Sequence, residues 1–189
     1  ALETYVNVID NMYAQTALKL GAECGLTGEI KGTYKSANEN TKLEKQFAGV
    51  WNVEDYWIVR PNELISKVKN KVEEIIKRAF ENKTRVSIDE IYSELIESPF
   101  GFLPCNLTAF VMGFVLRDYA NDTYNWTDDL TTVPMSIEKM KEMIEGIIKQ
   151  QQTPSPKYRH QYIVEMSPDQ REFNKSTAKV FGIDESLCT

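Results

Sequence analysis

The sequence predicts a mainly helical α+β fold: a winged helix-turn-helix core with an N-terminal helical extension and a C-terminal strand and helix. Apolar residues recur at helical spacing in several segments between 62 and 150. A turn rich in Pro and Gly separates two of these helices, and a pattern of two short strands follows the second. Helix-turn-helix followed by a hairpin is the order of a winged helix, in which the hairpin is the wing. The alternative is a plain helical bundle in which 123–133 is a loop.

The length of 189 residues and a hydrophobic content of 42% are enough for a compact unit with a real core. We divide it into an N-terminal helical and loop extension (1–60), a winged-helix domain (61–150) and a C-terminal strand–helix extension packed on the core (151–189). Because the chain begins with Ala1 rather than Met, we expect it to be a piece of a longer protein.

The N-terminal extension predicts a helix over 1–20 that ends near Gly21, since its apolar residues have helical spacing. Three glycines and many polar residues then predict a loop, and the segment TKLEKQFAGVW predicts a short helix. The segment VEDYWIVRP is aromatic and β-branched, which favours a short extended piece that ends at Pro61.

The core begins with a helix whose apolar stripe has a period of about 3.6 residues. This stripe consists of Leu64, Ile65, Val68, Val72, Ile75, Ile76, Ala79 and Phe80. TRVSI then predicts a brief strand, and Ser87 with Glu90 matches the capping box that opens a second helix. Pro99, Gly101 and Pro104 force a turn before a third helix over about 105–120, which holds the recognition position.

The rest of the chain predicts a hairpin around an acidic turn at Asp128 and Asp129, then a helix in SIEKMKEMIEGIIKQ. The segment KYRHQYIVEM alternates like a strand, and its charges favour a position at a sheet edge. A last helix is predicted to begin at Ser167 and Pro168 and to end at Gly182.

No motif in the sequence indicates catalysis, so we expect a protein that is not an enzyme and uses no cofactor. Its one histidine, His160, has no evident activated nucleophile beside it. An enzymatic interpretation would need a pocket that gathers His160 with carboxylates from distant segments. Cys24, Cys105 and Cys188 lack metal-ligand spacing, and no Gly-rich phosphate loop occurs. We therefore expect no metal and no small-molecule substrate. Without a disulfide pattern or a membrane-spanning run, we expect a cytoplasmic protein.

The predicted recognition helix is poorly suited to DNA. Its outward positions are expected to be Asn106, Thr108, Ala109, Met112, Gly113, Leu116 and Arg117. Only Arg117 is cationic, the wing tip is acidic, and the net charge is −6. DNA remains the alternative partner through a more basic face. That nucleic-acid set comprises Lys67, Lys71, Lys77, Arg78, Lys83, Arg85 and Arg117.

Protein contact is the function that the sequence favours. We expect Met112 and Leu116 to be exposed beside the core stripe of the recognition helix, and Trp51 and Trp57 to belong to an aromatic cluster before the first core helix. Aromatic and Met side chains are enriched at interface cores. The expected partner is another protein or a neighbouring domain of the parent chain.

The segment VSIDEIYSELIESPFGFLPCNLTAFVMGFVLRDY resembles a winged-helix segment of large bacterial P-loop NTPases, some of them encoded in phage-defence loci. The resemblance covers about 85–150, and Pro99-Phe100-Gly101 stands at the turn typical of that group. It implies an accessory domain outside the ATPase core that couples nucleotide state to DNA or to a partner. No catalytic residue is carried over. We therefore expect a non-catalytic module of a larger bacterial protein.

Overall fold

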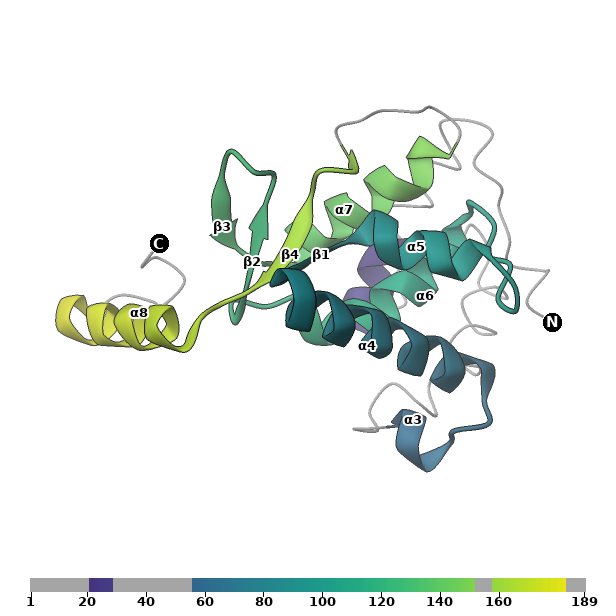
Figure 1. Cartoon of the computed structure of the whole chain (residues 1–189), viewed down its shortest axis with the longest axis horizontal. Helices are drawn as coiled ribbons and strands as arrows, with labels where there is room; N and C mark the ends of the chain where they lie inside the picture. The colour runs from purple at the N-terminus through teal and green to yellow at the C-terminus, as the bar shows by residue number, and fades with distance from the viewer. Residues whose placement is uncertain (1–20, 29–55, 152–157, 183–189) are drawn as a thin grey trace.

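The structure, a computed structural model, describes residues 21–28, 56–151 and 158–182 and is a mixed α+β fold (Figure 1). The predicted helices at 1–20 and in TKLEKQFAGVW lie outside the described residues, as does Trp51. Residues 21–27 are helical, so the prediction of a helix that ends near Gly21 and gives way to a loop was wrong there. Ala22 and Gly25 of this helix lie against the core helix that contains Gly113.

The first core helix, α4 (Leu64–Lys83), forms as the apolar stripe predicts and buries Val68, Val72, Ile75 and Ile76. It ends at Thr84, whose left-handed backbone (φ 60°) lets its N–H donate to the Phe80 carbonyl at 3.2 Å. Before α4, α3 (Tyr56–Val59) is a helical turn, so the predicted extended piece was wrong. None of the described strands pairs with this segment, and β propensity without a strand neighbour does not fix a strand.

The segment predicted to be a helix-turn-helix forms the helices and the strand that the sequence indicates. β1 (Arg85–Ser87) leads into α5 (Ile88–Ile96), and the predicted capping box is confirmed. The Glu90 N–H donates to Ser87 Oγ, and the Ser87 N–H donates to Glu90 Oε2, both at 3.1 Å. After the turn, α6 (Asn106–Leu116) continues into a short 3-10 helix, η2 (Arg117–Tyr119).

The predicted hairpin is present as β2 (Tyr124–Thr127) and β3 (Thr132–Pro134). Within the described residues the strands form one four-stranded antiparallel sheet in the order β1-β4-β2-β3. β4 (Tyr162–Glu165) is therefore an inner strand, and the prediction of an edge position was wrong. Its central residue explains the placement: Ile163 is fully buried between Val86 of β1 and Trp126 of β2. Val86, Ile163 and Trp126 form one row of side chains across three strands, and this row excludes water only when β1 and β2 both flank β4.

Two further helices complete the fold. α7 (Ile137–Gln150) is capped by Ser136 and packs its Met- and Ile-rich face into the core. α8 (Pro168–Phe181) is capped by Ser167, has Pro168 in its first turn and ends at Gly182, as predicted. In contrast to α7, α8 buries only Asn174 and Ala178 and lies at one end of the molecule (Figure 1).

Candidate functional site

α6, which the sequence assigned to the recognition position, lies inside the core rather than on the surface. Met112 and Leu116, which the sequence placed at a contact surface, are both 0% exposed, so that expectation was wrong. Thr108 and Ala109 are buried as well, and Leu107 is half-buried. α6 is apolar on nearly every side, and it packs against α4, α7 and the helix at 21–27. Residues 108–116 are all buried, so this part of α6 offers no face to a DNA groove.

Glycines let the helix at 21–27 lie directly on α6. A Cβ at Gly113 would stand 2.4 Å from the Ala22 carbonyl oxygen and 3.0 Å from the Leu26 nitrogen. A Cβ at Gly25 would stand 2.2 Å from the Phe110 carbonyl oxygen. The contact is backbone against backbone, which only residues without a side chain allow.

A buried lysine joins α3, α4 and η2. Lys69 is 1% exposed, and its ammonium donates to the Val115 carbonyl at 2.9 Å and to Asp118 Oδ2 at 2.8 Å. It also pairs with Glu73 Oε1 at 2.7 Å and lies 4.8 Å from the centre of the Trp57 ring. All three ammonium protons therefore have acceptors, which is what a buried charge requires.

The sequence held a signal for this cluster. Lys69 follows Ile65 by four residues and precedes Val72 by three, so it lies within the apolar stripe. Beside it the Tyr119 hydroxyl donates to Glu73. Burial first, and then this hydrogen bond to a carboxylate, raise the pKa of Tyr119 well above its ordinary value.

Most of the nucleic-acid set is paired with carboxylates instead of forming an open basic face. Lys71 contacts Glu94 at 3.0 Å, and Arg78 contacts the same carboxylate at 3.9 Å. Lys83 pairs with Glu90 at 2.6 Å. Arg85 pairs with Asp129, and Arg117 lies over the Phe114 ring near Asp118. The last two members, Lys67 and Lys77, are exposed. These pairs lower the positive potential that phosphate contacts need.

The hairpin tip is acidic, as the sequence indicates. Asp128 Oδ1 accepts hydrogen bonds from the Thr131 N–H at 2.7 Å and the Leu130 N–H at 3.1 Å. The bond from Thr131, with help from that of Leu130, outweighs desolvation and holds the pKa of Asp128 below its ordinary value. The tip therefore carries a carboxylate at neutral pH, and Leu130 beside it is 93% exposed.

The apolar surface lies elsewhere than the sequence suggested. Trp57 is half-buried against the core, but its neighbours Ile58 and Val59 are each 68% exposed and Leu64 is 52% exposed. We call Ile58, Val59 and Leu64 the junction patch, since they flank the turn between α3 and α4. The sequence pattern did not indicate this patch, because it placed Ile58 and Val59 in an extended piece and Leu64 in the core stripe.

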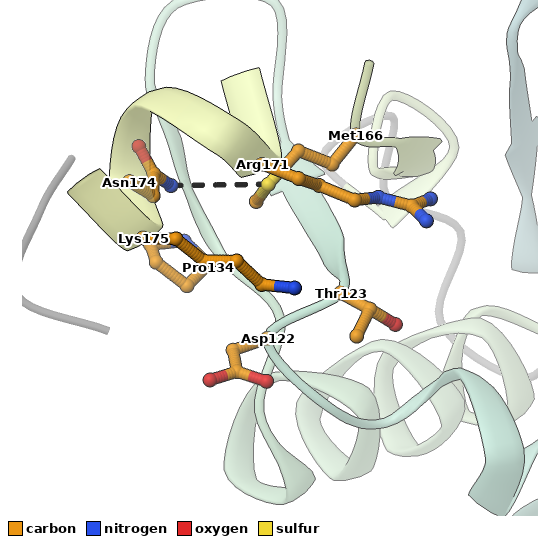
Figure 2. Close-up of a pocket in the computed structure, with 7 residues that line it drawn as sticks. All are labelled: Asp122, Thr123, Pro134, Met166, Arg171, Asn174 and Lys175. Atoms are coloured by element: carbon orange, nitrogen blue, oxygen red, sulfur yellow. Dashed lines mark hydrogen bonds between the residues drawn. The ribbon is translucent and has the colours of Figure 1, made fainter. Parts of the chain in front are cut away.

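α8 carries a second group of exposed apolar side chains, and it contacts the body through its other side. Its inner side closes a pocket of about 160 Å³, where Asn174 Nδ2 approaches Met166 Sδ at 3.8 Å (Figure 2). The pocket is lined by Asp122, Thr123, Pro134, Met166, Arg171, Asn174 and Lys175. Phe173, Val180 and Phe181 are 66%, 77% and 71% exposed. We call these three residues the α8 stripe.

His160 does lie with carboxylates from distant segments. It is exposed and lines a pocket of about 430 Å³ together with Asp128, Lys139 and Glu142. Lys139 Nζ lies 4.3 Å from the centre of the Trp126 ring, which also lines this pocket. The lining contributes no hydroxyl or thiol, so the arrangement has proton donors and acceptors but no nucleophile.

No group of three or more His, Cys, Asp or Glu residues among the described residues is arranged to hold a metal ion. Similarly, no helix in this part of the chain is long and apolar enough to cross a bilayer. No protein-family model, curated protein or solved structure matches the chain.

Proposed function

We propose that the chain is a non-catalytic winged-helix module of a larger bacterial protein and acts through contact with another protein or with a neighbouring domain. The winged-helix assignment rests on the order α4, β1, α5, α6 and the β2–β3 hairpin. The insertion of β4 between β1 and the hairpin is a departure from a simple wing. The origin in a P-loop NTPase remains a prediction from the resemblance.

The junction patch is the observation that carries the contact proposal. A folded domain gains little by leaving Ile58, Val59 and Leu64 in water, because each would contribute about 1.5–3 kcal/mol if it were fully buried. The buried Lys69 ammonium contacts the Trp57 ring and holds it against α4, so α3 and its exposed patch are fixed in position. The buried α6 and the carboxylate-paired cations favour such an apolar contact over DNA.

A site-specific photo-cross-linker at position 58 tests the contact in the complete protein as its cell makes it. We expect an adduct to form from position 58 and to be lost when Val59→Asp and Leu64→Asp remove the apolar surroundings. The control places the same cross-linker at Leu130, which is exposed but outside the patch. Equal adducts from both positions, or none from position 58, would refute the contact at the junction patch.

Fluorescence anisotropy with labelled duplex and single-stranded DNA tests the alternative function. Phosphate contacts weaken steeply between about 50 mM and about 200 mM salt, whereas apolar contacts do not. We expect no binding at either concentration. Binding that collapses at the higher salt, and that Lys67→Glu with Lys77→Glu abolishes, would establish the nucleic-acid module instead.

A further inference from the structure

We propose that the pocket between α8 and the hairpin binds a small organic acid, whose carboxylate lies between the cations of Arg171 and Lys175. The site is separate from the junction patch, and the proposal goes beyond the proposed function. Because its residues and its test are separate, either proposal can fail while the other holds.

The pocket is assembled from segments that meet only in the folded protein (Figure 2). Arg171 and Lys175 come from α8, and Pro134 is the last residue of β3. Met166 lies between β4 and α8, and Thr123 directly precedes β2. The pocket volume of about 160 Å³ is close to that of a cavity of about 150 Å³ that admits benzene. The pocket therefore has room for a carboxylate on a body of about that size.

Arg171 brings a buried hydrogen-bond donor that lacks an acceptor. Its Nε atom is buried and has no hydrogen-bond partner among the described residues. Its Nη2 atom lies 3.8 Å from Glu165 Oε1, which is too long for a hydrogen bond. A buried N–H that has lost water without gaining an acceptor is unfavourable. A guanidinium can bind a carboxylate through two parallel hydrogen bonds, so a bound acid would supply the missing acceptor.

Lys175 adds a second cation on the same side of α8. It follows Arg171 by four residues, and both side chains leave the helix in the same direction in Figure 2. No carboxylate of the described residues lies within ion-pair distance of the Lys175 ammonium. Like charges at this spacing repel each other. A water molecule would satisfy only the Nε N–H, whereas an anion also removes the repulsion between the two cations.

The rest of the lining favours a monocarboxylate over a phosphate. The two cations share the pocket with one carboxylate, that of Asp122, so the lining suits a single negative charge better than the nearly two charges of a phosphate. The Thr123 hydroxyl already donates to Asn121 Oδ1 at 2.5 Å, so it is not a donor for a ligand. Pro134 and Met166 offer apolar surface, which suits the organic body of the acid.

Titration of the isotope-labelled chain with benzoate, followed by heteronuclear NMR, tests the site. Sodium chloride keeps the ionic strength constant up to about 20 mM benzoate, because exposed charges respond to salt. We expect saturable shifts of the Thr123, Met166 and Asn174 amides with a Kd on the order of 1 mM, since a ligand of about nine non-hydrogen atoms has limited affinity. Benzamide, the uncharged analogue, should not bind. No saturation with benzoate, or equal binding of benzamide, would overturn the proposal.

Variants matched along α8 test the two cations. Arg171→Gln should weaken benzoate binding by at least about tenfold, and Lys175→Gln by about threefold. Lys179→Gln is the control, because it removes an exposed cation of the same helix outside the pocket. Asp122→Asn should tighten binding by about threefold through loss of the opposing charge, a gain that misfolding cannot produce. Circular dichroism checks that each variant is folded. An unchanged affinity in Arg171→Gln, or an equal loss in Lys179→Gln, would overturn the assignment.

Two further ligands test the class of acid. Inorganic phosphate should bind more weakly than benzoate. A tripeptide with a free C-terminal carboxylate should bind no more tightly than benzoate, because its body is larger than the pocket. Phosphate binding that is tighter than benzoate binding and is lost in Arg171→Gln would overturn the choice of a carboxylate. Tripeptide binding at least about tenfold tighter than benzoate binding would overturn the choice of a small acid.

Discussion

Replacing Gly113 by Ala should destabilise the fold, although the same change at an exposed helical site would stabilise it. Helix propensity alone favours Ala over Gly by about 1 kcal/mol. In the structure, however, the new Cβ would stand 2.4 Å from the Ala22 carbonyl oxygen and 3.1 Å from the Gly25 Cα. Ordinary van der Waals contact begins at 3.4 Å, and the blocking atoms are backbone atoms that no rotamer change can move.

The helix at 21–27 must therefore move about 1 Å away from α6, which loosens the contacts of Ala22 and Leu26 with the core. Overpacking of this kind costs about 1–3 kcal/mol, which outweighs the gain in propensity. We expect the free energy of unfolding to fall by about 1–2 kcal/mol, measured by urea unfolding followed by circular dichroism. A matched variant, Ser93→Ala at an exposed site in α5, should change it by less than about 0.5 kcal/mol.

The double variant sharpens the test. Gly25→Ala relieves its 2.2 Å contact with the Phe110 carbonyl by the same outward movement. The costs of Gly25→Ala and Gly113→Ala should therefore be less than additive. A Gly113→Ala protein as stable as the natural one would refute the close crossing of the two helices, and strictly additive costs would refute a shared movement.

Three further predictions concern single polar groups. Tyr92→Phe should raise the free energy of unfolding by about 1 kcal/mol, because the buried Tyr92 hydroxyl has no hydrogen-bond partner. Tyr119→Phe should lower it, because the Tyr119 hydroxyl donates to Glu73. Equal effects of the two variants in urea unfolding would contradict this. Lys69→Met should lower the free energy of unfolding by about 2 kcal/mol and release Trp57 from its contact with the Lys69 ammonium. The release should appear as a red shift of tryptophan fluorescence, and an unchanged spectrum would argue against this contact. Partial burial would raise the pKa of Glu90, but hydrogen bonds from the Lys83 ammonium and the capping-box N–H hold it below its ordinary value. Its stabilising contribution is therefore present above the unfolded-state pKa and is lost as the pH falls through the folded-state pKa. Glu90→Gln should flatten the decline in stability between about pH 5 and about pH 3, and an unchanged slope would contradict the assignment.

Local signals in the sequence determined most of the helices and strands. The capping box at Ser87, the stripe of α4, the acidic turn of the hairpin and the Ser167 and Gly182 boundaries of α8 all depend on residues close in the chain. Such signals act through backbone geometry and short-range hydrogen bonds, so they can be read without knowing the rest of the fold. The acidic residues at the hairpin tip and the scarcity of cations on α6 can likewise be read directly from the sequence.

Contacts between distant segments decided what those signals left open. The sequence could not show that the helix at 21–27 seals α6, because Gly25 and Gly113 are far apart in the chain and meet only in three dimensions. Met112 and Leu116 are buried in the assembled core, and large exposed apolar residues lie instead in the junction patch and the α8 stripe. Likewise, only the tertiary structure shows that Lys69 is buried, because the Val115 carbonyl and Asp118 that accept its hydrogen bonds are distant in the chain. Periodicity fixes which side of a helix is apolar, but only the tertiary structure decides whether another element covers that side, since burial is a property of the whole fold.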